Sequence, residues 1–285
     1  MKHLQWFPGH MTKAMRMMED NVKLCDGIIY VLDARCPASS FNPKLKKMFG
    51  AKPVLYVLNK SDLADGKAES IAVAIRSSGA PCVKINAADN RSKRDICGAI
   101  EKLIGEKRAA NELKGYSKTF RFMVCGVPNT GKSTVINLIA GAARTQTGDK
   151  AGVTRGKQWV RLDGWELLDT PGTTPPAFEN QKLAVRLAYV GSLNDDILDM
   201  DDISLALLAE LKEKYPASLK ERYGIENEQT PLEMLERVCV RRGFILRGNE
   251  YDYERAEKAV IDDFRKGRLG RVTLDSVEDC KSFTF

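Results

Sequence analysis

The feature that most constrains the fold of this 285-residue chain is the run GVPNTGKS at residues 126–133. It fits the pattern G-x-x-x-x-G-K-[ST], and it stands between an apolar run at 120–125 and a helical pattern at 132–139. In such a loop the glycines let successive backbone N–H groups and the helix N-terminus face a polyphosphate. The run therefore predicts a phosphate-binding loop at the carboxyl end of a strand in an α/β sheet.

The residues of this loop have expected roles toward the nucleotide. Lys132 is expected to reach the β- and γ-phosphates, where it contributes to catalysis, and Ser133 to offer its hydroxyl to Mg²⁺. The other loop residues that we assign to nucleotide binding are Asn129, Thr130, Gly131 and Thr134.

A second motif, DTPG at residues 169–172, follows a short apolar strand. In this position Asp169 is expected to act on Mg²⁺ through water, and the Gly172 N–H to meet the γ-phosphate during catalysis. Between the two motifs lies Thr154, which could close on Mg²⁺ only when a γ-phosphate is present. We therefore count Thr154 with Ser133 and Asp169 as metal residues, and among the catalytic ones.

The motif that would determine which base is bound is NKSD, which begins at Asn59. The Asp62 carboxylate can accept two N–H bonds from the edge of guanine, whereas adenine offers no such donor pair. Asn59 is expected to meet the N7/O6 side of the purine, and the Lys60 stem to cover the ring. Asn86 and Ala87 are expected to supply a backbone N–H to O6. The expected ligands are thus GTP and GDP. This motif argues against the alternative that the chain is a metabolic kinase or an ATPase.

The alternation of short apolar runs with helical patterns up to residue 172 predicts a mostly parallel sheet with helices on both faces. The expected strands are 27–32, 53–58, 82–86 and 120–125, and the expected helices are 63–77, 89–104 and 132–139. A hairpin of 158–162 with 166–168 is expected around a type I′ turn at Asp163-Gly164, and 106–117 is expected to be a connection. Later helical patterns at 183–189, 203–214, 232–242 and 251–264 predict an all-α domain.

The order of the motifs is unusual, because Asn59 precedes the phosphate loop by 67 residues. Ordinary GTPases have the phosphate loop first. The sites can still coincide, since joining surface termini and cutting the chain elsewhere leaves a sheet intact. We expect a GTPase domain at 1–175 and a helical domain at 176–285 that binds RNA or the ribosome. Because the γ-phosphate motif leads directly into the helical domain, we expect nucleotide state to be transmitted to it.

Composition narrows the remaining possibilities. The 45 Lys and Arg against 38 Asp and Glu give a net charge of +7. The seven cysteines are scattered and never spaced C-x-x-C, which argues against a disulfide framework or a zinc ribbon, and indicates small buried apolar residues. No apolar run is long enough for a membrane span and no leader is evident, so we expect a cytoplasmic protein. Candidate RNA-binding residues are Arg91, Lys93, Arg94, Arg241, Arg242, Arg255, Lys258, Arg265, Lys266, Arg268 and Arg271.

The permuted order, together with FPGHMTKA at 7–14, DAR at 33–35, GVTRG at 152–156 and FRKGRLGR at 264–271, resembles the ribosome biogenesis GTPase A (YlqF-type) family over essentially the whole chain. The resemblance implies a circularly permuted P-loop GTPase domain followed by a small all-α domain. It also implies a factor that binds the precursor of the large ribosomal subunit, its rRNA and ribosomal proteins, and acts late in assembly. The particle would stimulate hydrolysis and so trigger release.

One departure concerns catalysis. Thr173 stands where many GTPases place the glutamine that orients water, and the run TTPP at 173–176 replaces the family's aliphatic residue and Trp-Pro. Intrinsic hydrolysis should therefore be slow. The resemblance implies His10 as the substitute, although a capping or surface role for it stays open. Asn129 resembles the residue that helps bind K⁺ in some GTPases. A monomer is expected, and a non-ribosomal regulatory switch that engages a protein partner stays the alternative.

Overall fold

A six-stranded sheet in the order β3-β2-β1-β4-β6-β5 forms the centre of the larger part of the molecule. The computed structural model describes residues 9–141, 159–175, 180–228 and 230–281. The strands are β1 (Gly27–Asp33), β2 (Val54–Asn59), β3 (Cys82–Lys84), β4 (Phe120–Cys125), β5 (Trp159–Leu162) and β6 (Trp165–Asp169). All neighbours are parallel except β5 and β6, which are antiparallel. The mostly parallel sheet and its edge hairpin are confirmed.

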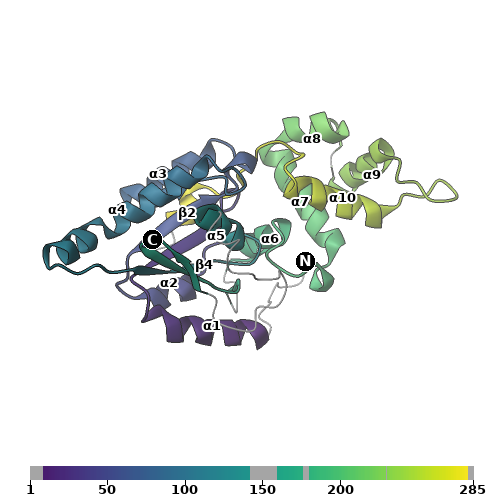
Figure 1. Cartoon of the computed structure of the whole chain (residues 1–285). Coiled ribbons are helices and arrows are strands. Elements are labelled where there is room, and N and C mark those ends of the chain that lie inside the picture. The colour runs from purple at the N-terminus through teal and green to yellow at the C-terminus, as the bar shows by residue number, and fades with distance from the viewer. Residues whose placement is uncertain (1–8, 142–158, 176–179, 229, 282–285) are drawn as a thin grey trace.

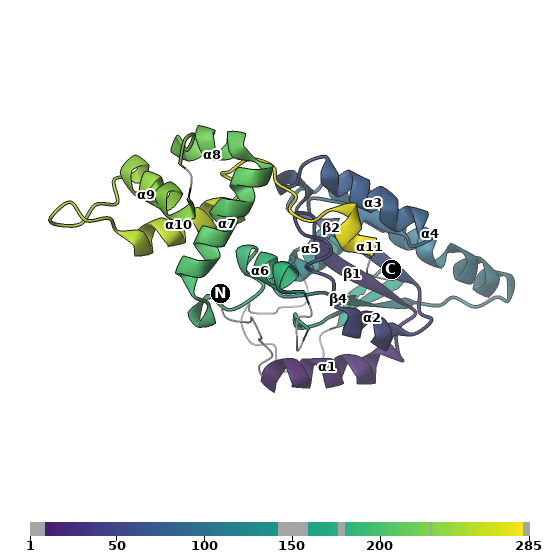
Figure 2. The same ribbon diagram turned by 180° about the vertical axis from the view of Figure 1, so that it is seen from behind.

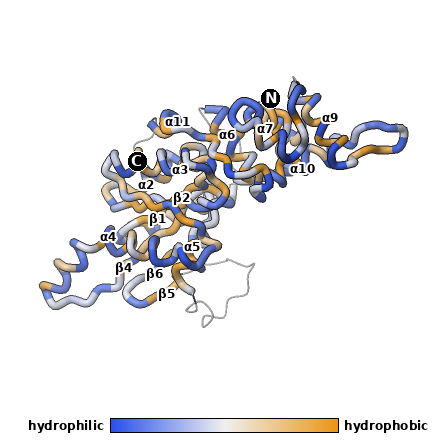
Figure 3. The backbone as a smooth tube through the Cα atoms, turned by 90° about the horizontal axis from the view of Figure 1, so that it is seen from above, coloured by the Kyte–Doolittle hydropathy of each residue, from blue (hydrophilic) through white to orange (hydrophobic). Residues whose placement is uncertain are grey.

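Helices cover both faces of this sheet, as expected (Figure 1). They are α1 (Gly9–Val22), α2 (Pro43–Phe49), α3 (Lys67–Ser77), α4 (Ser92–Leu113) and α5 (Lys132–Ala140). Alternate residues of β1 point to opposite faces, so Tyr30 packs in the cluster with α2 and α3, and Ile29 in the cluster with α4 and α5. The strands are the apolar layer between these helices (Figure 3). They are buried on both faces, as their nearly continuous apolar runs predict.

Two local predictions for this part were wrong. Most of the segment 106–117 is not a connection, because α4 continues to Leu113 and only 114–117 lie outside the helix. Each glycine inside this helix, Gly98 and Gly105, costs only about 1 kcal/mol, which the good helix formers around them offset. The turn at Asp163-Gly164 is not type I′, since only Gly164 has a positive φ, of 74°, whereas type I′ requires positive φ at both central residues.

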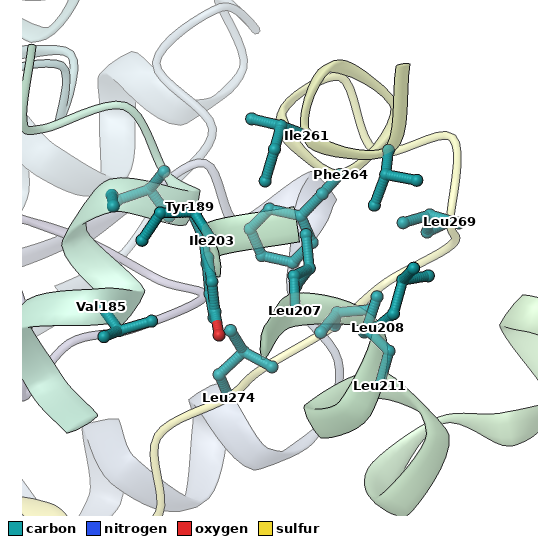
Figure 4. Packing of buried hydrophobic residues seen from close by; sticks show 14 of the residues in the cluster. Val185, Tyr189, Ile203, Leu207, Leu208, Leu211, Ile261, Phe264, Leu269 and Leu274 are labelled. Atoms are coloured by element: carbon teal, nitrogen blue, oxygen red, sulfur yellow. The ribbon is translucent and has the colours of Figure 1, made fainter. Parts of the chain in front are cut away.

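The second part of the molecule is helical, as the later sequence patterns predict. Its helices are α6 (Gln181–Tyr189), α7 (Met200–Lys214), α8 (Pro216–Tyr223), α9 (Pro231–Arg242) and α10 (Tyr253–Arg265). Side chains of α6, α7 and α10 meet in one apolar core, where the Tyr189 ring lies edge-on to Phe264 (Figure 4). The ends of α9 follow from local chemistry: Thr230 and Glu233 form a capping box, and Gly243 at φ 68° ends the helix.

The end of the described chain returns to the sheet. The backbone N–H of Val272 donates to Leu63 O at 2.9 Å, and that of Leu274 donates to Arg35 O at 2.7 Å. The short helix α11 (Val277–Lys281) then lies against α3 (Figure 2). The chain thus crosses between the two parts twice, and its division at residue 175 stays a prediction. Within the described residues, no helix is long and apolar enough to cross a membrane.

A candidate guanine-nucleotide site at the carboxyl edge of the sheet

The sequence motifs meet at one edge of the sheet. In the register of the parallel strands, Asp33 at the end of β1 is the partner of Asn59 at the end of β2. Asp169 likewise ends β6 beside β4, whose last residue leads into the phosphate loop. The sheet order reverses between β1 and β4, because β2 and β3 lie on one side and β6 and β5 on the other. Ligands of open α/β sheets bind at this kind of switch point.

The phosphate loop runs from β4 to the N-terminus of α5, as predicted. Its two glycines are required for two reasons: their backbone has positive φ, and there is no room for a side chain. Gly126 has φ 149° and a Cβ there would collide with Val31 O, whereas Gly131 has φ 88° and a Cβ there would collide with the Asn59 side chain. The buried Thr130 hydroxyl donates to Val127 O at 3.1 Å and stabilises the turn.

Asn59 joins the base motif to the phosphate loop, although they are far apart in the sequence. Its buried side chain donates from Nδ2 to Thr130 O at 2.9 Å and accepts at Oδ1 from the Ala87 N–H, also at 2.9 Å. Both ends of the amide are therefore used within the protein. Asn59 positions the two loops that would hold the nucleotide, and its expected contact with the purine stays a prediction.

Lys60 is held by a buried carboxylate that the sequence motifs did not place in the site. Its Nζ lies 2.9 Å from Asp33 Oδ2 and donates to Asn129 O at 2.5 Å. Asp33 also pairs with Arg35 through two hydrogen bonds of 3.0 and 2.8 Å. Burial alone would raise the pKa of Asp33, but the charges of Arg35 and Lys60 outweigh it and hold that pKa well below its usual range.

Lys132 is buried, and its Nζ donates to Val127 O at 2.8 Å. Burial lowers the pKa of Lys132 to about 8, while the charge of Asp169 opposes this shift. A nearby polyphosphate would favour the charged ammonium, so nucleotide binding above pH 8 should take up a proton.

We expect the affinity for GDP to fall by about tenfold between pH 7 and pH 9, since only the protonated Lys132 pairs with the phosphates. Titration calorimetry in buffers of different ionisation enthalpy would measure both the affinity and the proton uptake. A Lys132→Arg variant serves as the control, because a guanidinium stays charged in this range. A wild-type decline that the variant shares would contradict the assignment to Lys132.

The two expected metal residues in the described part of the chain lie together. The exposed Ser133 hydroxyl donates to Asp169 Oδ2 at 3.3 Å. Hard oxygen donors of this kind suit Mg²⁺, which keeps several waters and phosphate oxygens among its ligands. Among the residues that the structure describes, no three His, Cys, Asp or Glu side chains gather into a metal site.

Gly172 packs directly on the phosphate loop. A Cβ at this position would lie 2.6 Å from Pro128 N and Cα, and 2.9 Å from Lys132 Nζ. The next residue, Thr173, donates from its N–H to Gly126 O at 3.3 Å. Its buried hydroxyl has no hydrogen-bond partner among the described residues, so a side chain that orients water is replaced here by one turned into the protein.

The side chain expected to read the base is accessible. Asp62 lies exposed in the 3₁₀ turn Ser61–Leu63, directly after β2. The N–H groups of the neighbouring loop have partners in the protein: that of Asn86 donates to Ser92 Oγ at 3.2 Å, and that of Ala88 to Asn86 Oδ1 at 3.0 Å. Thr134 is exposed at the first turn of α5.

Two predicted catalytic residues cannot be placed. Thr154 and the side chain of His10 lie outside the described residues. The backbone of His10 is in the first turn of α1, and the next residue, Met11, accepts a hydrogen bond at Sδ from the Thr174 hydroxyl at 3.2 Å. The start of α1 therefore lies against the segment that follows Gly172.

The candidate RNA-binding residues divide into two groups. Most of them pair with acidic side chains: Arg91 with Asp89, Arg255 with Asp252, Lys258 with Glu254, Arg265 with Asp195, and Lys266 and Arg268 with Asp262. Those without an ion pair in the described part of the chain are Lys93, Arg94, Arg241, Arg242 and Arg271. The structure thus removes Arg265 in particular from the exposed basic surface.

Sequence reasoning missed the role of Asp33 and Arg35. The signal was present in the sequence, because a buried carboxylate needs a cation to pair with it, and Arg35 follows Asp33 by two residues at the end of an apolar run. The fold and this site define the class: a P-loop GTPase whose base motif precedes its phosphate loop.

Known proteins agree with this class. The chain is 37% identical to ribosome biogenesis GTPase A of Bacillus cereus, over 97% of this chain and 95% of that protein. It therefore belongs to the ribosome biogenesis GTPase A family, and it is a GTPase. Residues 121–234 match the 50S ribosome-binding GTPase family. Mitochondrial ribosome-associated GTPase 1 of Bos taurus is 31% identical over 95% of this chain and 88% of the relative.

Solved structures share the whole architecture. GNP-bound YlqF from T. maritima has a TM-score of 0.64 at 26% identity, over 94% of this chain and 99% of that one. The GDP-bound structure of the same protein has the same TM-score at 25% identity, over 92% and 100%. These matches cover both parts of the molecule and support guanine-nucleotide binding.

Proposed function

We propose that this protein is a GTP-dependent assembly factor that binds the precursor of the large ribosomal subunit in the cytoplasm. It would promote late maturation and leave when the particle stimulates hydrolysis. The observation that carries the proposal is the joining of a guanine-nucleotide site to a helical part in one chain whose relatives are named for ribosome biogenesis over nearly their full length. The resident ligands would be GTP or GDP with Mg²⁺, and the chain would act as a monomer.

The arginines without ion pairs supply a contact surface for rRNA. Arg241 and Arg242 stand exposed at the C-terminus of α9, beside the loop that extends far from the sheet in Figure 1. Phosphate contacts need cations that are not already neutralised, because an arginine held by a carboxylate must first give up that pair. We therefore place the RNA contact at the end of α9 rather than along α10.

Three residues, His10, Thr154 and Asn129, would take part in a hydrolysis reaction that is slow until the particle stimulates it. With Thr173 turned into the protein, His10 is the proposed group that orients the attacking water once the particle binds. Thr154 would close on Mg²⁺ in the GTP state, together with Ser133 and Asp169. Asn129 would contribute to a K⁺ site, although its side chain donates to Gly191 O in the structure.

Co-sedimentation with large-subunit precursors tests the function. We expect the protein loaded with a non-hydrolysable GTP analogue to sediment with the particles, the GDP form to sediment less, and salt to weaken both. An Arg241→Gln/Arg242→Gln variant should bind the particles about tenfold more weakly, because two phosphate contacts are lost.

The matched control is Lys258→Gln/Lys266→Gln, which removes the same charge from residues that are paired with Glu254 and Asp262. It should change particle binding by less than about twofold. Absence of nucleotide-dependent sedimentation would instead favour the alternative, a regulatory GTPase that engages a protein partner. Equal losses in the two variants would contradict the specific contact at α9.

A further inference from the structure

The phosphate loop is bound on its outer side by the link between α6 and the 3₁₀ turn Asp195–Ile197. The Ser192 hydroxyl donates to Pro128 O at 2.7 Å, and the Asn129 side chain donates to Gly191 O. Ser192 is buried. Val127, also in the loop, packs into the apolar core of the helical part. Three consecutive residues of the phosphate loop therefore depend on the helical part for their position.

Arg265, the last residue of α10, binds the residues that precede this link and the residue that follows it. Its guanidinium donates to Ala188 O at 2.8 Å and to Tyr189 O at 3.0 Å, which are carbonyls at the C-terminus of α6. It also pairs with Asp195, with hydrogen bonds of 2.6 and 2.7 Å to the two carboxylate oxygens. A Cβ on Gly191 would lie 3.2 Å from the guanidinium and 3.4 Å from Asn129 Nδ2, so the link lies against both side chains.

A second chain of contacts leads from the same loop to the same helix end. Asn129 O accepts from Lys60, which pairs with Asp33, which in turn pairs with Arg35. Arg35 then donates to Phe264 O at 3.2 Å and to Arg265 O at 3.3 Å. The end of α10 is thus tied to Asn129 by one path through the base motif and by another through Arg265 and the link.

From this closed ring we propose that Arg265 and Ser192 are positioning residues of the nucleotide site. They hold Pro128 and Asn129 in the conformation that presents the loop N–H groups to the phosphates. Neither residue touches the reacting atoms, so their loss should weaken nucleotide binding without changing the chemical step. By linkage, bound nucleotide should in turn strengthen the contact between the loop and the link.

Arg265→Gln tests the proposal, together with Ser192→Ala, which removes a single hydroxyl. We expect each variant to raise the dissociation constants for GDP and for a GTP analogue by about fivefold, the value of one lost hydrogen bond. KM for GTP should rise by the same factor with kcat within about twofold, since KM follows the dissociation constant when chemistry is slow. Amide hydrogen exchange of residues 127–130 should become faster.

Two further variants separate positioning from folding and from charge. Lys266→Gln, one residue away, removes the same charge from a side chain whose one ion pair among the described residues is with Asp262, and it should leave KM and exchange unchanged. Arg265→Lys keeps a charge toward Asp195 but cannot span both carbonyls, and it should resemble Arg265→Gln. Loss of folded protein alone would lower apparent kcat and leave KM unchanged. Unaltered KM and loop exchange in both Arg265→Gln and Ser192→Ala would overturn the proposal.

Discussion

Replacement of Asp62 by asparagine should convert this GTPase into one that prefers xanthosine triphosphate. The carboxylate of Asp62 would accept two N–H bonds from guanine, and hydrogen bonds to a charged group contribute about 1.5–3 kcal/mol each, so their loss should weaken GTP binding by about 100-fold or more. Xanthine carries a carbonyl in place of the amino group, and an asparagine amide can donate to it. Competition between the two nucleotides for a fluorescent GDP would measure the switch.

The exposed position of Asp62 makes this test specific, because the side chain takes part in no ion pair within the described residues. Asp89→Asn is the matched control. It removes the same charge from the adjacent loop, where Asp89 pairs with Arg91, and it should leave the preference for guanine intact. If Asp62→Asn retains the wild-type preference, the base is read by another group.

Substitution of Gly172 by alanine should abolish most of the hydrolysis while the protein stays folded. The new Cβ would lie 2.6 Å from the Pro128 backbone and 2.9 Å from Lys132 Nζ, so the phosphate loop and the γ-phosphate motif cannot keep their present separation. Displacement of reacting groups by about 1 Å can cost on the order of 100-fold in rate. We expect a loss of that size in kcat/KM for GTP, and a smaller one in GDP affinity.

Gly98→Ala controls for the added methyl group. Gly98 lies inside α4 with nothing within 4 Å of a Cβ, so alanine should stabilise the protein by up to about 1 kcal/mol and leave hydrolysis unchanged. Single-turnover hydrolysis and thermal melting of the two variants would separate the outcomes. A Gly172→Ala enzyme with wild-type kcat/KM would contradict the close approach of Gly172 to the loop during catalysis.

The helix boundaries show where local patterns were sufficient and where they were not. The pattern of α9 predicted that helix to within a residue, because the period of its apolar residues reflects the face that packs, whereas the predicted start of α7 was three residues late. Helices α1, α2, α8 and α11 were missed. The last three are short and contain few turns, so they depend on tertiary contacts more than on their own sequence.

The site shows the same division. A guanine-nucleotide site was predicted from the motifs at 126–133, 59–62 and 169–172, because recognition of phosphate and base requires particular residues at particular spacings. The expected roles of these side chains toward the nucleotide stay predictions. Arg265 was predicted to lie on an RNA-binding surface, yet it binds the carbonyls at the end of α6.

The sequence by itself determined the class of fold, the kind of nucleotide and the permuted order of the motifs, since these depend on short runs of adjacent residues. Only the tertiary structure decided how the motifs hold one another: Asn59 against Thr130, Asp33 between Lys60 and Arg35, and Ser192 on the phosphate loop. The physical reason is that each of these contacts joins polar groups distant in sequence. Their partners are chosen by burial and by the geometry of the sheet edge, neither of which a local pattern records.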